Sequence, residues 1–170
     1  MPLSHPDAAP LTVLGGFLRN GYLHRAIREQ GGAYGGGASQ ENNIAAFRFF
    51  SYRDPRLEDT LSDFDRALQW LHNETHQWQQ VEEAILGVIS SIDKPGSPAG
   101  EAKETFQAEL YGRSREVRET FRNRVRETTL DDLRRVAATY LVAENVSTAV
   151  ITSPDQASLA DALQLTPVSL

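Results

Sequence analysis

Residues 23–37, which read LHRAIREQGGAYGGG, decide how the first third of this chain folds. A charged helical pattern ends there in a turn with glycines at 31, 32, 35, 36 and 37 around the single aromatic residue Tyr34. Glycine has no Cβ atom, so the backbone around Tyr34 can take a positive φ and can let another chain or a ligand come close. The pattern predicts a contact site, with Arg28 and Tyr34 as its chemical groups.

The residues on either side of this turn predict a helix followed by a β-hairpin. Apolar residues recur every three or four positions upstream of it, at Leu11, Leu14, Leu18 and Tyr22. This spacing predicts an amphipathic helix that runs to about Gln30, with Gly31 at its C-cap. Downstream, aromatic and β-favouring residues predict strands at 33–39 and 44–52, joined by a polar turn.

Beyond residue 55 the chain is mostly helical in pattern. Asp54 and Pro55 form a helix-start signal, and a Pro/Gly loop at 94–100 separates two groups of helices. The predicted helices cover 57–71, 78–92, 102–111, 116–126, 129–140 and, at the end, 154–163. A short strand is predicted at 147–152. The order predicts an α+β fold in which several helices pack on one face of an antiparallel sheet.

Composition narrows the possible partners. A length of 170 residues suits one domain, and a net charge of −6 argues against nucleic acid, which requires a basic surface. No apolar run approaches the roughly 20 residues that a membrane-spanning helix needs. The absence of cysteine excludes disulfides and thiolate metal sites.

The words REQGGAYG at 28–35 and FFSYRDP at 49–55 resemble the carboxy-terminal half of the pitrilysin/insulinase family of zinc metallopeptidases, in its presequence-protease branch. The resemblance implies that residues 1–170 are one carboxy-terminal metallopeptidase-homology domain, truncated at its amino-terminal strands. It further implies a longer enzyme that degrades peptides in a closed chamber, cytoplasmic in a bacterium or in an organelle matrix in a eukaryote. Its zinc would lie in the amino-terminal half, so this segment alone would be inactive.

The same resemblance implies roles for the residues of the turn. Tyr34 would donate its hydroxyl to the scissile carbonyl as that oxygen becomes an oxyanion, and Arg28 would hydrogen-bond the substrate backbone. Gly32 and Gly35 would complete the substrate contact. Composition alone leaves a simpler alternative, in which Arg28 pairs with a surface carboxylate and Tyr34 packs as an ordinary strand residue.

Two other patterns carry weaker signals. His72 and His76 are spaced for a shared metal on a helix, but neither the H-E-x-x-H nor the H-x-x-E-H motif is present, so no metal role is predicted. The arginine-rich segment 113–126 contains interleaved glutamates, which predicts surface ion pairs. Two further functions remain open, a non-catalytic subunit of the same family and an unrelated α+β module that binds peptides.

Overall fold

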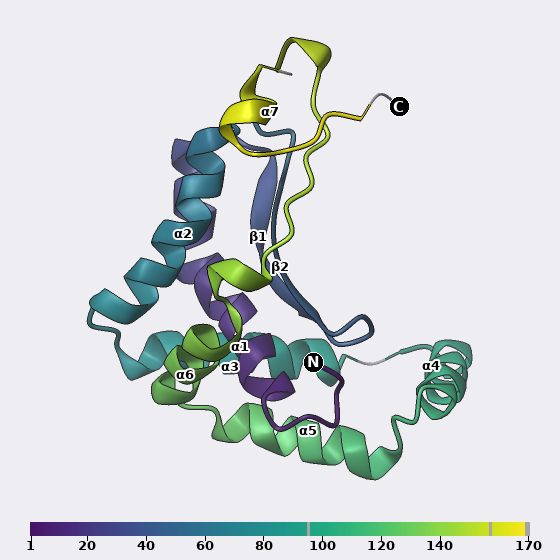
Figure 1. Ribbon diagram of the computed structural model, residues 1–170. Coiled ribbons are helices and arrows are strands. Elements are labelled where there is room, and N and C mark those ends of the chain that lie inside the picture. The colour runs from purple at the N-terminus through teal and green to yellow at the C-terminus, as the bar shows by residue number, and fades with distance from the viewer. Residues whose placement is uncertain (95, 157, 169–170) are drawn as a thin grey trace.

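A computed structural model describes residues 1–94, 96–156 and 158–168, and it places a set of helices around a long β-hairpin (Figure 1). The elements are α1 (Ala8–Leu18), the π-helix η1 (Arg19–Gln30), β1 (Gly35–Glu41), β2 (Ala46–Tyr52), α2 (Glu58–Asn73), α3 (Trp78–Ile92), α4 (Pro98–Leu110), α5 (Arg115–Glu127), α6 (Leu130–Tyr140), the 3₁₀ turns η2 (Ala143–Asn145) and η3 (Pro154–Gln156), and α7 (Leu159–Ala162). The predicted α+β class is confirmed, with helices dominating the chain.

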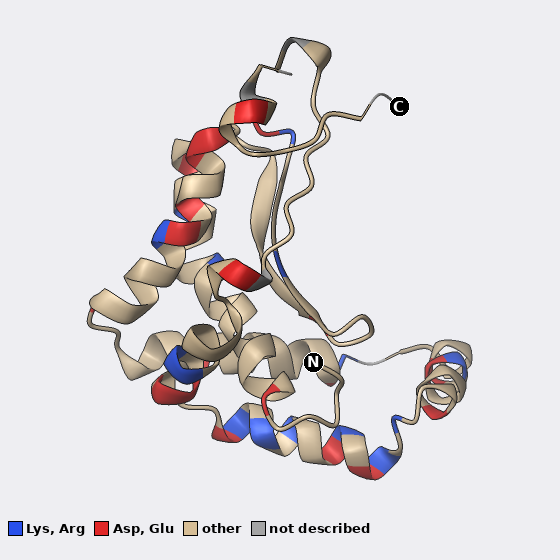
Figure 2. Cartoon of the chain, in the orientation of Figure 1, with Lys and Arg blue, Asp and Glu red and all other residues tan. Residues whose placement is uncertain are grey.

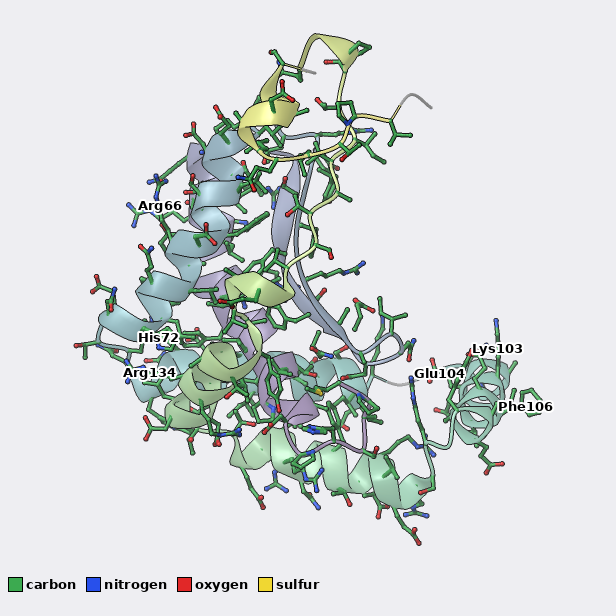
Figure 3. The ribbon with its side chains drawn as sticks, in the orientation of Figure 1. Arg66, His72, Lys103, Glu104, Phe106 and Arg134 are labelled. Carbon is green, nitrogen blue, oxygen red and sulfur yellow. The ribbon has the colours of Figure 1, made fainter. Side chains whose placement is uncertain are left out.

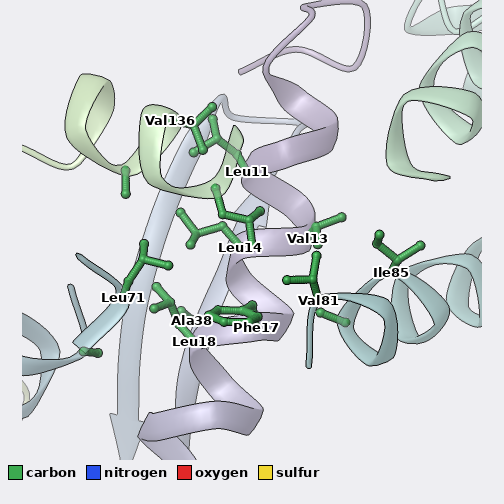
Figure 4. Close-up of a cluster of buried hydrophobic side chains, with 14 of the residues drawn as sticks. Leu11, Val13, Leu14, Phe17, Leu18, Ala38, Leu71, Val81, Ile85 and Val136 are labelled. Atoms are coloured by element: carbon green, nitrogen blue, oxygen red, sulfur yellow. The ribbon is translucent and has the colours of Figure 1, made fainter. Parts of the chain in front are cut away.

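The core is built around α1, which is buried on nearly all sides. Leu11 lies on the side of α6, near Val136, whereas Val13 lies on the side of α3, near Val81 and Ile85 (Figure 4). A helix that is apolar all round is stable only when other elements enclose it. The remaining face of α1 packs on β1, and Gly15 makes this possible because a Cβ atom there would lie 3.0 Å from the Cα atom of Ser39.

The helix predicted to reach Gln30 is present, but its second half is a π-helix. The chain leaves η1 through Gly31, and Gly32 then adopts a φ of +79°. Two backbone hydrogen bonds close this end, from the Gly32 N–H to the Arg28 carbonyl at 3.2 Å and from the Ala33 N–H to the Ile27 carbonyl at 3.1 Å. The exit from the helix is therefore fixed just before Tyr34.

The predicted hairpin is confirmed, although both strands begin two residues later than predicted and β1 extends to Glu41. The strands β1 and β2 are antiparallel from the pair Gly35 and Tyr52 to the pair Glu41 and Ala46. The strand predicted at 147–152 is wrong. This segment runs alongside β2 (Figure 1), but a groove of about 1100 Å³ lies between them, lined by residues of β2, α2 and 146–153. The groove keeps this segment apart from β2, so within the described residues it forms no ladder with β2 and its backbone remains outside the sheet.

The starts of α2 and α4 also differ from the predictions. The start of α2 is at Glu58, because the Asp54 carboxylate accepts hydrogen bonds from the Arg56 N–H and the Thr60 hydroxyl and so shapes a turn. Helix α4 begins at Pro98, inside the predicted loop 94–100, because the Ser97 hydroxyl caps it; residue 95 of that loop lies outside the described residues.

The helix predicted at 154–163 is instead two short pieces, η3 and α7, and residue 157 between them lies outside the described residues. Among the helices that the structure describes, none combines the length and the apolar character needed to cross a lipid bilayer.

Asp7 joins the start of the chain to α6. Its carboxylate accepts hydrogen bonds from the Arg135 guanidinium at 2.8 Å and from the Tyr140 hydroxyl at 2.6 Å. The hydrogen bond from Arg135 is the main cause that lowers the pKa of Asp7, and partial burial opposes it. A carboxyl group with a lowered pKa in the folded state stabilises the fold above its unfolded pKa of about 3.9 and loses that contribution as pH falls through the folded pKa.

We expect Asp7→Asn to lower the free energy of unfolding by about 1–2 kcal/mol at pH 7, because two hydrogen bonds lose their charged acceptor. The difference between the variant and the wild type should begin to shrink as the pH falls below about 4, the unfolded pKa of aspartate, and should be lost below the lower pKa of Asp7 in the fold. Urea unfolding at several pH values measures this. Asp65→Asn, at an exposed position of α2, is the control. A difference that is the same at pH 3 and pH 7 would contradict the assignment.

Candidate functional site

Tyr34 lies between the end of η1 and the start of β1, and 62% of its surface is exposed. Its N–H donates to the Arg53 carbonyl at 3.2 Å, which extends the hairpin by one hydrogen bond beyond Gly35 and Tyr52. Its ring centre lies 5.6 Å from that of Tyr52 and 5.3 Å from the Cζ atom of Arg53. The backbone and the ring of Tyr34 are thus both held by the end of β2.

Arg28 lies in the last turn of η1 and is exposed. Its guanidinium lies 3.4 Å from the His24 ring, whose other nitrogen is 3.2 Å from the Glu29 carboxylate. The salt bridges of the described residues do not include Arg28. The structure therefore leaves this guanidinium available to an external acceptor. Arg28 and Tyr34 lie on either side of the glycine pair at 31 and 32.

The glycines of the turn have different structural roles. Gly32 is exposed, and the nearest atom to a Cβ there would be Pro55 Cγ at 3.7 Å, so its positive φ rather than lack of space demands glycine. At Gly35, a Cβ atom would lie 2.5 Å from the Tyr52 ring. Gly35 thus makes room for the aromatic neighbour of Tyr34, and its direct contact with a substrate stays a prediction.

Three neighbours of the turn were not predicted as part of the site. Tyr52 and Arg53 reach Tyr34 only through the pairing of β1 with β2, and Arg53 has a φ of +49°. Arg56 donates to the Ala26 carbonyl at 3.3 Å and to the Asp63 carboxylate at 3.1 Å, which ties α2 to η1 behind the turn. The only sequence signal for Tyr52 and Arg53 is their position in the SYRDP word that carries the family resemblance, and Arg56 directly follows that word.

His72 and His76 do not share a site. His72 is in the last turn of α2, and the Nε2 atom of His76 lies 3.1 Å from the Trp70 carbonyl and 3.2 Å from the Leu71 carbonyl. Because both neighbours are acceptors, this nitrogen must carry a proton and cannot bind a metal. The structure, over the residues it describes, has no cluster of three or more metal-binding side chains.

The surroundings of His72 also disfavour a metal cation. Arg134 of α6 lies at this end of α2 (Figure 3), where it donates to the Leu71 carbonyl at 3.2 Å and the Glu74 carbonyl at 3.1 Å. The C-terminus of a helix favours a positive charge, and at the C-terminus of α2 the Arg134 guanidinium already provides that charge. Within the part of the chain that the structure describes, His72 and His76 therefore do not form a shared zinc site.

The arginine-rich helix α5 carries alternating positive and negative side chains (Figure 2). Arg115 pairs with Glu119 at 2.7 Å, as the interleaved glutamates predict, whereas Arg122 pairs with Asp93 at the end of α3. Exposed pairs of this kind each stabilise a fold by less than about 1 kcal/mol. Two of the five arginines of α5 are thus paired with carboxylates of this chain, which fits a solvated face.

This chain is similar to known proteins over the residues that carry the family resemblance, 28–35 and 49–55. The family model of the PreP C-terminal domain matches residues 7–153. Mitochondrial presequence proteases of Yarrowia lipolytica and Eremothecium gossypii are 40% and 41% identical over 142 and 146 residues, covering 84% and 85% of this chain. The chain spans only 14% of the length of each of these relatives.

A solved structure has the same fold at lower identity. It is the inactive peptidase domain of a candidate zinc protease from Bordetella parapertussis, which superposes with a TM-score of 0.70 at 20% identity. The superposition covers 85% of this chain and 83% of that one.

Proposed function

The chain belongs to the PreP C-terminal domain family, and on this premise we propose that it is the substrate-contacting segment of a zinc metalloendopeptidase that degrades peptides in a closed chamber. The observation that carries the proposal is that the family match includes the glycine turn, which holds Tyr34 and Arg28 at an exposed surface. Zinc and the general base would come from the amino-terminal part of the full-length protein. The 170-residue segment alone would not hydrolyse peptides.

In this function Tyr34 and Arg28 act on the substrate in different ways. The Tyr34 hydroxyl would donate to the scissile carbonyl oxygen as negative charge develops there, which stabilises the transition state more than the ground state. Arg28 would donate to backbone carbonyls of the bound peptide, using the rigid fork of its guanidinium. Bound zinc would polarise the same carbonyl or activate the attacking water.

The groove beside β2 supports a partnership with the amino-terminal part of the same protein. One side of β2 is unpaired within the described residues, and the apolar residues Leu61, Phe64 and Leu68 of α2 are only half-buried against it. Extended strands from the preceding part of the polypeptide would bond to β2 and cover this apolar stripe. The full-length protein would be located in the matrix of an organelle in a eukaryote and in the cytoplasm in a bacterium.

Arg28→Ala tests the proposed substrate contact. In the full-length protein we expect the KM for an unfolded peptide to rise roughly tenfold or more, because a charged hydrogen-bond donor to the substrate is lost. Zinc content, measured by atomic absorption, should not change. Arg25→Ala provides a matched control, since Arg25 is an exposed arginine three residues earlier in η1. Equal KM values for the two variants would refute the role of Arg28.

A further inference from the structure

We propose that Arg53 is a positioning residue for Tyr34: it holds the Tyr34 ring from one face and the Tyr34 backbone through a hydrogen bond, so that the hydroxyl is aimed before a substrate arrives. The inference rests on the proposed function of Tyr34. In this role Arg53, at the end of β2, orients Tyr34 for the reaction, which the glycine turn alone does not do.

The backbone of Arg53 provides the first line of evidence. Its φ of +49° lies in the left-handed region, which glycine and asparagine adopt readily and arginine does not. The conformation directs the Arg53 carbonyl to the Tyr34 N–H at 3.2 Å, one step beyond the last strand pair. Glycine takes a positive φ at Gly32 and Gly112, whereas Ala45 and Gln164 are, like Arg53, non-glycine residues with a positive φ. The left-handed conformation is unfavourable for arginine, so the backbone gives no reason for arginine at this position. The reason is to be found in the contacts of the side chain.

The contacts of the side chain give that explanation. The Arg53 Cζ atom lies 5.3 Å from the centre of the Tyr34 ring, within the range of a cation–π interaction. Arg53 has no salt bridge among the described residues, and the adjacent Asp54 carboxylate is already bonded to Arg56 and Thr60. The guanidinium therefore has the Tyr34 ring as its identified partner, and it is exposed at the surface where Tyr34 is exposed.

Positioning matters here because Tyr34 is a surface residue. An exposed side chain changes rotamer within picoseconds to nanoseconds, and a donor that must be ordered during the reaction stabilises an oxyanion less than one already in place. Tyr52, whose ring lies 5.6 Å away, restricts Tyr34 as well. The guanidinium contacts the ring and leaves the hydroxyl available. Loss of Arg53 should then lower kcat more than it changes KM.

The test uses the full-length zinc enzyme with an unfolded peptide substrate. We expect Arg53→Asn, which keeps the left-handed backbone but removes the cation, to lower kcat roughly 3-fold to 30-fold, with KM within about twofold. Arg53→Lys should recover part of the lost kcat because it restores a cation. The thermal midpoint of Arg53→Asn should equal or exceed that of the wild type, since asparagine tolerates this φ better. Arg48→Asn is the matched control, because Arg48 also lies over an aromatic ring of the hairpin, that of Phe50 at 5.6 Å.

The outcomes separate this inference from the proposed function. A wild-type kcat for Arg53→Asn together with an impaired Tyr34→Phe would overturn the positioning role and leave the Tyr34 role intact. A fall in kcat that comes with a lower thermal midpoint would also overturn it, because Arg53 would then only stabilise the fold. Wild-type turnover in both variants would remove the proposed function and this inference together.

Discussion

Replacing Tyr34 by phenylalanine in the full-length peptidase is expected to lower kcat about 100-fold to 1,000-fold, the range found when one oxyanion donor is removed. The substitution deletes a single hydroxyl group from a residue that is 62% exposed, so it should leave the fold and its stability almost unchanged. KM should change little if the hydroxyl bonds the carbonyl oxygen only as charge develops on it.

Tyr52→Phe is the matched control for this experiment. Tyr52 is also exposed, at 51%, and its ring lies beside that of Tyr34, but no part in the chemistry is proposed for its hydroxyl. The kinetics should be measured at saturating and at low peptide concentration, with zinc content determined on the same samples. Wild-type turnover by Tyr34→Phe would contradict the role proposed for this residue.

Leu14→Ala is expected to lower the free energy of unfolding of the chain by about 3–5 kcal/mol, the upper part of the range for a buried leucine. Leu14 is fully buried near the middle of α1, in the hydrophobic core that α1 shares with β1, α3, α5 and α6. These elements cannot all move inward at once to fill the cavity. Because a domain of this size is stable by about 5–15 kcal/mol, the variant should be close to unfolding at 37 °C.

Urea unfolding followed by circular dichroism measures this change. Leu86→Ala removes the same atoms from an α3 position that is 60% exposed, and it should change stability by less than about 0.5 kcal/mol. An equal loss of stability in the two variants would show that α1 is not the centre of the core.

The helices and the hairpin were predictable because their signals are local. Leu11, Leu14 and Leu18 follow the helical period in sequence, and the aromatic residues before Tyr52 follow the pattern of a strand. The strand predicted at 147–152 has an equally good local pattern, yet a strand also requires a partner, and a groove separates this segment from β2. Pairing depends on residues far away in sequence, so the local pattern could not decide it.

In the candidate site, too, the local signals could be predicted from the sequence and the contacts between distant residues could not. Arg28 and Tyr34 could be selected because a dense group of glycines around one aromatic residue is visible in the sequence. Arg53 could not be assigned a role, because its contact with Tyr34 depends on the register of β1 and β2 and on a backbone conformation that arginine rarely adopts. Likewise the role of Gly35 in admitting the Tyr52 ring depends on that register.

The position of α1 has a consequence for synthesis of the protein. Its apolar residues between Ala8 and Leu18 are covered by α3, α5 and α6, and the last of these ends at Tyr140. At 5–20 residues per second, a ribosome would take roughly 6–25 s to make the residues that separate α1 from the end of α6. Throughout that time the most apolar helix of the domain lacks part of its cover. Until α6 has been made, part of the apolar surface of α1 is therefore open to contact with other chains.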